Sequence, residues 1–224
     1  MTQLLLGIVP DWLPTLDNFV PGHNGELLAL LRQALVGEGE RSLYLWGEPG
    51  CGKTHLLHAV VAAAQDLGLS VEYASGRVPG VADMVAVDDV ERLDATAQVE
   101  LFALYNRMRE RGGLLLTSGQ AAPRQLELRD DLRTRLGWGL VYAVHTLTDA
   151  EKAEALQRHA QGKGCRVPDD VVHYLLRHGS RSLNSLLGML DALDERSLRL
   201  HRPISVPLLR EVMQDASQMR LPEL

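Results

Sequence analysis

Residues 47–54 combine glycines, a lysine and a hydroxyl in a spacing that suits phosphate binding; the run is Gly47, Glu48, Pro49, Gly50, Cys51, Gly52, Lys53 and Thr54. The glycines let the backbone adopt conformations that other residues resist, so that its N–H groups turn inward onto phosphate oxygens. Lys53 would reach the β- and γ-phosphates, and the Thr54 hydroxyl would ligate Mg²⁺. The segment is therefore predicted to be a P-loop that binds ADP or ATP with Mg²⁺, and we include the next residue, His55, among the nucleotide-binding residues.

Two carboxylates follow an apolar run at residues 84–87, which we predict to be a buried strand. At the end of such a strand, the carboxylate of Asp88 could hold Mg²⁺ directly or through water. The next residue, Asp89, could orient a water molecule for attack on the γ-phosphate. An acidic turn or a helix cap would give the same pattern, but the presence of the P-loop favours the catalytic interpretation.

The elements that position these residues alternate between strands and helices. Short apolar runs predict strands at residues 43–46, 69–74, 84–87, 114–117 and 141–144. Apolar side chains at helical spacing predict helices at 26–36 and 53–67, and Asp94 is predicted to cap a third helix that Gly112 closes. This alternation predicts an α/β fold with a parallel sheet that is covered on both faces.

After His145 the pattern changes to helices. Helical spacing of apolar residues predicts them near 149–161, 169–178, 181–199 and 206–217. Thr148 and Glu151 have the spacing of a capping box, which indicates where the first of these helices begins. The change of pattern places a domain boundary near residue 146.

Composition narrows the class of protein. The net charge of -6 argues against broad binding to nucleic-acid phosphates, which needs a basic face. No apolar run is long enough to span a membrane, so no membrane partner is expected. Cys51 and Cys165 have neither a paired spacing nor a metal-binding pattern, and they are interpreted as reduced thiols of a cytoplasmic protein.

The P-loop and the acidic pair together resemble those of an AAA+ ATPase, and two further segments resemble the initiator DnaA. Residues 16–22 resemble the DnaA segment that borders the adenine pocket, which implies that Phe19 and Val20 contact the nucleotide. Residues 136–140, preceded by Arg135, resemble the DnaA segment that contains its arginine finger. The resemblance covers roughly residues 14–217. It implies a P-loop AAA+ core at 13–146 and a C-terminal all-helical lid at 147–224.

A DnaA-like core without a DnaA-type DNA-binding domain resembles the Hda family of DnaA regulators. In that family a short N-terminal peptide binds the DNA polymerase III β sliding clamp, and residues 1–12 resemble such a peptide. The resemblance assigns clamp contacts to four side chains, namely Gln3, Leu4, Leu6 and Ile8. An extended peptide could make these contacts because alternate side chains share one face. A strand packed on its own core, or a frayed terminus, is the alternative.

Two arginines acquire roles from the same resemblance. Arg135 would act in trans as an arginine finger on ATP held by DnaA, where a guanidinium stabilises the charge of the transferred phosphoryl oxygens. The alternative is a surface arginine paired with Asp130 or Asp131, which would contribute little. Arg181 matches the second sensor position of the family, where an arginine contacts the phosphates of the bound nucleotide.

Two departures from the family pattern predict weak hydrolysis at this chain's own site. DnaA has an acidic sensor residue after the strand at 114–117, whereas this chain has Ser118, Gly119 and Gln120. Asp89 replaces the glutamate that is usual in active AAA+ ATPases, and its shorter side chain would place water less well. His55 and His58 lie one turn apart on the helix after the P-loop, but no third metal ligand is evident.

The sequence thus predicts an Hda-like regulator of replication initiation in the bacterial cytoplasm, associated with the nucleoid. It would hold ADP or ATP, bind the sliding clamp, and stimulate hydrolysis of DnaA-bound ATP. DNA would be contacted only indirectly, through the clamp, and a homo-oligomer is compatible with the resemblance. One alternative is an AAA+ helicase loader or DNA-remodelling ATPase. Another is a nucleotide-locked structural module without catalysis.

Overall fold

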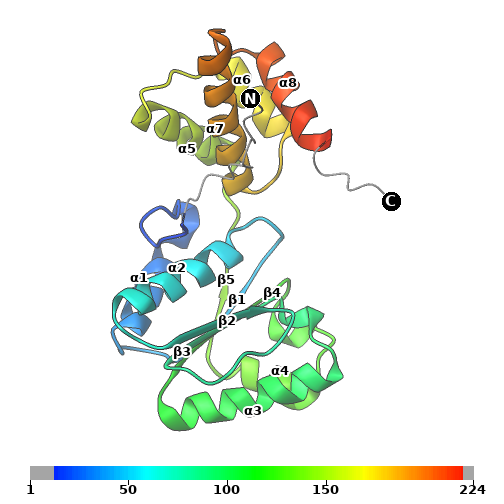
Figure 1. Cartoon of the computed structure of the whole chain (residues 1–224). Helices are drawn as coiled ribbons and strands as arrows, with labels where there is room; N and C mark the ends of the chain where they lie inside the picture. Colours follow the sequence, from blue (N-terminus) through cyan, green and yellow to red (C-terminus); the bar gives the residue numbers. More distant parts are fainter. Residues whose placement is uncertain (1–12, 219–224) are drawn as a thin grey trace, which may run out of the picture. The chain divides into compact units, whose positions relative to one another are not determined.

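The computed structural model describes residues 13–218 and divides them after Thr146 into two compact units (Figure 1). The first unit, Leu13–Thr146, contains a β-sheet with helices packed on it. The second begins at Leu147 and, as far as the described residues extend, contains helices alone. The predicted α/β fold with a C-terminal helical part is therefore confirmed.

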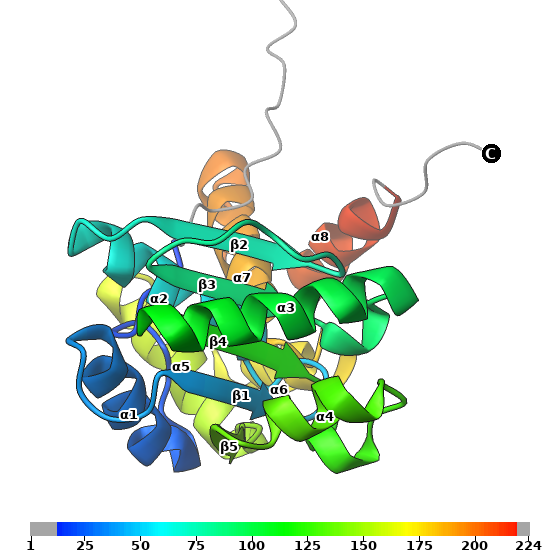
Figure 2. The same ribbon diagram turned by 90° about the horizontal axis from the view of Figure 1, so that it is seen from below.

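Five strands form one parallel sheet in the order β2-β3-β4-β1-β5 (Figure 2). Their bounds are β1 Ser42–Trp46, β2 Val71–Ser75, β3 Met84–Asp88, β4 Leu114–Gly119 and β5 Leu140–Ala143. The pairing register sets Trp46 opposite Gly119 and Ser75 opposite Asp88. The carboxyl ends of these strands therefore meet at one edge of the sheet, and the P-loop leaves β1 at that edge.

Helices cover both faces of the sheet, as the alternation of elements predicts (Figure 2). Successive side chains of a strand point to opposite faces. Leu43 and Leu45 of β1 therefore join one core, while Tyr44 joins the other. α1 and α2 lie on the first face and α3 and α4 on the second, with bounds α1 Gly25–Leu35, α2 Lys53–Asp66, α3 Ala95–Arg111 and α4 Asp130–Leu136. Single 3-10 turns connect these elements at η1 Gly22–Asn24, η2 Val90–Arg92 and η3 Pro123–Gln125.

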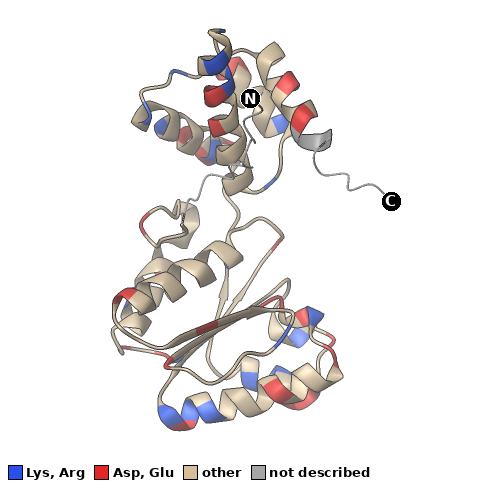
Figure 3. Cartoon of the chain, viewed as in Figure 1, with Lys and Arg blue, Asp and Glu red and all other residues tan. Residues whose placement is uncertain are grey.

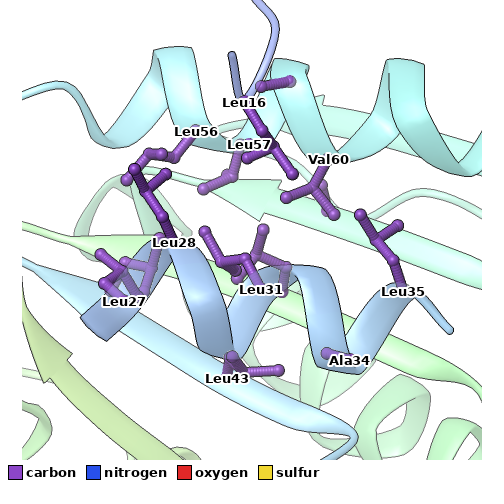
Figure 4. Packing of buried hydrophobic residues seen from close by; sticks show 14 of the residues in the cluster. Leu16, Leu27, Leu28, Leu31, Ala34, Leu35, Leu43, Leu56, Leu57 and Val60 are labelled. Carbon is purple, nitrogen blue, oxygen red and sulfur yellow. The ribbon is translucent and has the colours of Figure 1, made fainter. Parts of the chain in front are cut away.

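Leucines from α1 and α2 meet between the two helices above β1 (Figure 4). Leu27 and Leu31 of α1 and Leu56 and Leu57 of α2 are almost completely buried. Burying such a side chain stabilises the fold by roughly 2 kcal/mol relative to leaving it exposed. This packing fixes α2 on the sheet, and with it the P-loop at the start of α2.

The short helix α4 is absent from the sequence-based prediction. Its seven residues include only two apolar side chains, Leu132 and Leu136, which are too few to establish a helical period. Both leucines are buried in the core that α3 and the sheet also form. Tertiary packing rather than intrinsic propensity holds such a short helix, and its last turn carries Arg135.

The second unit is a bundle of helices around its own core, with bounds α5 Asp149–Gly162, α6 Asp169–His178, α7 Leu183–Leu200 and α8 Val206–Gln218. The predicted capping box at Thr148 and Glu151 is present. Inside the bundle, Oδ1 of Asp191 lies 2.6 Å from Nε2 of His159 and 2.7 Å from Nζ of Lys163, which joins α7 to the end of α5. Among the helices of residues 13–218, none has the length and apolarity that crossing a bilayer requires.

Candidate nucleotide-binding site

The P-loop follows β1 and runs into α2, and two of its glycines are fixed by both conformation and space. Gly47 has φ 154°, and a Cβ there would lie 2.6 Å from the carbonyl oxygen of Val144. Gly52 has φ 104°, and a Cβ there would lie 2.7 Å from the Phe19 ring. A larger residue at either position would combine backbone strain with a steric clash. The sequence therefore needs glycine at these two points to form the loop.

Lys53 projects into the loop that precedes it. Its ammonium donates hydrogen bonds to the carbonyl oxygens of Gly47 at 2.7 Å and Glu48 at 3.2 Å, and the side chain is 7% exposed. The Sγ atom of Cys51 lies 3.7 Å from the same ammonium, and Cys51 is a free, buried thiol. The positive charge is thus held beside the loop at the N-terminus of α2, and the N-terminus of a helix favours phosphate.

Asp88 is buried at the end of β3 and accepts hydrogen bonds from three hydroxyl groups. Thr54 Oγ1 lies 2.7 Å and Tyr73 Oη 3.3 Å from its Oδ2, and Ser118 Oγ donates to its Oδ1. A carboxylate beside a threonine hydroxyl is a donor set that suits Mg²⁺, which takes oxygen ligands and is usually held by few protein groups plus phosphates. Within the described part of the chain, no group of three or more His, Cys, Asp or Glu side chains is arranged so that it could hold a metal ion.

Tyr73 and Ser118 belong to this site although the sequence analysis assigns neither a role in it. Tyr73 lies on β2 and Ser118 on β4, the two strands that flank β3. Burial raises the pKa of the Tyr73 hydroxyl, and the negative charge of Asp88 raises it further, so Tyr73 remains a hydrogen-bond donor. The only sign of such a role in the sequence was that each of these two polar residues lies near the end of a predicted strand. Their partner could not be identified without the order of the strands.

We expect Tyr73→Phe to weaken the Mg²⁺-dependent part of ATP affinity by about fivefold, because one hydrogen bond that orients the Asp88 carboxylate is lost. Isothermal titration of ATP with and without Mg²⁺ measures this difference. Tyr142→Phe is the matched control, since the Tyr142 hydroxyl donates to Glu26 at 3.1 Å instead. Equal Mg²⁺ dependence in Tyr73→Phe and the unaltered chain would exclude this role for Tyr73.

Asp89 has a left-handed backbone conformation, with φ 54°, which is uncommon for a residue other than glycine. Its carboxylate accepts a hydrogen bond from Ser75 Oγ at 3.2 Å and lies 3.5 Å from a guanidinium nitrogen of Arg92. These contacts draw the carboxylate toward the end of β2. The proposed role of Asp89 in orienting water stays a prediction, and so does the weak hydrolysis inferred from its short side chain.

The segment predicted to border adenine packs on the P-loop side of the core. The Phe19 ring lies next to Gly52. Its centroid is also 5.5 Å from the centroid of the His55 ring. His55 Nε2 lies 3.1 Å from the carbonyl oxygen of Thr15. Val20 is half-buried beside Phe19. The structure thus brings Phe19, Val20 and His55 to the loop, while their contact with a nucleotide remains a prediction.

Arg135 does not form either of the ion pairs considered in the sequence analysis. Asp130 binds Arg133 and Asp131 binds Arg129. The guanidinium carbon of Arg135 lies instead 3.9 Å from the centroid of the Trp138 ring. Its Nε is buried and has no hydrogen-bond acceptor among the described residues.

Arg135 and the P-loop lie near opposite ends of the strands of the sheet. Arg135 is in the last turn of α4, just before β5, and Leu140 at the start of β5 pairs with Leu43 near the start of β1. From Leu43 to the first P-loop residue, a strand advances roughly 13 Å. Arg135 therefore lies toward the amino ends of the strands, whereas its own P-loop lies at their carboxyl ends.

Five predicted residues remain. Arg181 is exposed and precedes α7 in the second unit. Its contact with nucleotide phosphates stays a prediction. The predicted clamp contacts, Gln3, Leu4, Leu6 and Ile8, lie outside the described residues.

Comparison with known proteins places this fold and site in a class. The family model of the bacterial DnaA ATPase domain matches residues 13–78 and 77–143, and that of the Hda lid domain matches residues 149–213. The chain is thus a P-loop protein of the AAA+ class. Because the two matches join a DnaA ATPase domain to an Hda lid, the chain belongs to the Hda family of DnaA-related AAA+ proteins.

Solved structures with low sequence identity share the fold. Domain III of the Thermotoga maritima replication initiation protein DnaA matches with a TM-score of 0.72 and 21% identity, over 90% of this chain and 95% of that one. AMPPCP-bound DnaA from Aquifex aeolicus matches with a TM-score of 0.69 and 22% identity, over 85% and 71%. The chain spans 65% of a solved DNA replication initiation factor, to which it is 20% identical with a TM-score of 0.69 over 83% of this chain. Membership of the family supports nucleotide binding and a role in regulating replication initiation.

Proposed function

We propose that this chain is a nucleotide-bound adaptor that stimulates hydrolysis of ATP held by DnaA and thereby restrains replication initiation. Three features support the proposal, namely the P-loop with its buried Lys53 and Asp88, the position of Arg135, and the family to which the chain belongs. Its own nucleotide is ADP or ATP with Mg²⁺, held by residues 47–54 together with Asp88. The proposal also assigns Arg181 a contact with the phosphates of this nucleotide.

The placement of Arg135 is the observation that carries the proposal. A finger that serves another molecule must lie away from its own phosphate site and must keep its charge available. Arg135 meets both conditions, because it lies in the last turn of α4, near the start of β5, and its guanidinium lies over a ring instead of being paired with a carboxylate. A guanidinium held in this way would stabilise the charge that spreads over the γ-phosphate oxygens during hydrolysis.

The sliding clamp brings the adaptor to DNA. In this proposal residues 3–8 bind the clamp as an extended peptide, with the Gln3 amide at the rim of a pocket and Leu4, Leu6 and Ile8 in apolar contact. DNA is contacted indirectly, through the clamp, which agrees with the net charge of -6. The protein would work in the bacterial cytoplasm near the nucleoid, as a monomer or a homo-oligomer.

A reconstituted assay tests the proposal. Phosphate release from DnaA preloaded with ATP is measured with the chain and with clamp loaded on DNA. We expect the chain to accelerate release only when the loaded clamp is present. No acceleration by a chain that binds nucleotide normally would refute the proposal, and strong DNA-stimulated hydrolysis by the chain alone would favour a helicase loader.

Deleting residues 1–8 is expected to abolish retention of the chain on immobilised clamp, because the predicted contacts all lie in that segment. The deletion leaves nucleotide affinity unchanged if the peptide serves clamp binding alone. A pulldown paired with ATP titration measures both properties. Full retention of the truncated chain on the clamp would rule out the peptide and leave the nucleotide site unaffected.

A further inference from the structure

Trp138 is a large apolar side chain on the surface, just after α4. It is 54% exposed. Its ring stands beside two hollows of about 440 Å³ each. One hollow includes Arg41 and Arg109, and the other includes Arg124 and Arg133. Figure 3 shows basic segments on α3 and around α4, the elements that border this ring. Single exposed apolar residues are common on protein surfaces, so the exposure of Trp138 by itself assigns it no role, and the contacts of its ring decide.

Two guanidinium groups lie over the Trp138 ring. The central carbon of Arg135 lies 3.9 Å and that of Arg109 lies 5.5 Å from the ring centroid. The Phe102 ring lies 5.5 Å from Arg135 as well. Both Arg135 distances are within the range of cation–π attraction, and a planar guanidinium also stacks on an aromatic face. The Arg135 guanidinium thus contacts two aromatic rings.

Aromatic stacking and ion pairing differ in whether the charge and the N–H donors of the guanidinium stay available to a partner. A carboxylate would hold Arg135 but would also neutralise it and occupy its N–H donors. The nearby carboxylates of Asp130 and Asp131 bind other arginines. A ring holds the guanidinium by its face, so the two terminal nitrogens keep their capacity to donate to phosphate oxygens even though Nε of Arg135 is buried. Such an arrangement limits the conformations of the side chain before a partner arrives.

We propose that Trp138 is the positioning residue of the Arg135 finger, holding the guanidinium in the conformation that reaches the partner's nucleotide. This inference rests on the proposed function. In it Trp138 acts through Arg135 and touches neither the nucleotide nor the reacting atoms. Trp138 therefore affects the maximal rate of stimulated hydrolysis more than the chain concentration that gives half of that rate.

Trp138→Leu and Trp138→Phe test this role, because leucine keeps apolar volume without a ring and phenylalanine keeps a ring face. Phosphate release from DnaA–ATP is measured with loaded clamp at increasing chain concentration. We expect Trp138→Leu to lower the maximal rate about tenfold with a half-saturating concentration within about twofold, and Trp138→Phe to restore most of the rate. An unchanged maximal rate in Trp138→Leu, or a raised half-saturating concentration alone, would overturn the inference.

A second measurement is independent of DnaA. The Nε–H resonance of Arg135, assigned by its loss in Arg135→Lys, should carry a ring-current shift that disappears in Trp138→Leu and persists in Trp138→Phe. An unshifted resonance in the unaltered chain overturns the positioning role whatever the rates. If the shift behaves as expected and Arg135→Ala still stimulates fully, the proposed function fails, and the role of Trp138 in catalysis fails with it. Unchanged ATP affinity in each variant shows that the core is folded.

Discussion

Lys53→Ala is expected to weaken binding of ADP and ATP by about 100-fold, because an ammonium that donates to phosphate oxygens makes charged hydrogen bonds that water replaces poorly. In the structure this ammonium is buried against the carbonyl oxygens of Gly47 and Glu48, so its position is fixed before any ligand arrives. Isothermal titration calorimetry with Mg²⁺ present measures the loss directly.

Two companion variants make the Lys53 result specific. Lys53→Met keeps most of the side-chain volume without the charge, so a similar loss in this variant assigns the effect to the ammonium and not to a cavity. Lys152→Ala is the matched control on α5, outside the predicted nucleotide contacts. Circular dichroism establishes that each variant is folded. Normal nucleotide affinity in folded Lys53→Met would remove the foundation of the proposed function.

Arg135→Ala is expected to lower the stimulated hydrolysis of DnaA-bound ATP by about 10³-fold or more, which is the effect of removing an arginine finger. This corresponds to at least about 4 kcal/mol of transition-state stabilisation. The chain's own affinity for nucleotide should not change, since Arg135 lies toward the sheet edge opposite the P-loop. Single-turnover phosphate release from DnaA, with the clamp loaded on DNA, gives the rate.

The neighbouring Arg133 provides a matched control on the same helix. Its guanidinium pairs with Asp130 at the surface, and such exposed pairs contribute little. Arg133→Ala should therefore stimulate DnaA almost as well as the unaltered chain. Arg135→Lys keeps the charge but loses the planar, stacked head group, so we expect it to recover only a small part of the rate. Stimulation by Arg135→Ala at the full rate would show that another group supplies the charge.

Much of the nucleotide site could be predicted because its parts are contiguous in the sequence. A P-loop is defined by glycines at fixed spacing between a strand and a helix, and both neighbours appear in the sequence as apolar runs of distinct period. The same holds for the acidic pair after β3 and for the capping box at Thr148. Local backbone conformation and hydrophobic periodicity are properties of short segments, so sequence alone expresses them.

Helix α4 and its surroundings could not be predicted in the same way. Leu132 and Leu136 form too short a pattern to identify a helix, and the core that buries them comes from distant segments. The sequence also left open whether Arg135 pairs with Asp130 or Asp131. The structure resolves this choice in favour of the Trp138 ring, because other arginines already occupy both carboxylates.

The sequence by itself determined the P-loop, the alternation of strands and helices, and the change to helices near residue 146. Tertiary structure alone decided that Tyr73 and Ser118 share Asp88, and that Arg135 stacks on Trp138 away from its own P-loop. The order β2-β3-β4-β1-β5 brings Tyr73, Asp88 and Ser118 together. Strand order depends on which apolar faces pack in three dimensions, and no single segment contains that information.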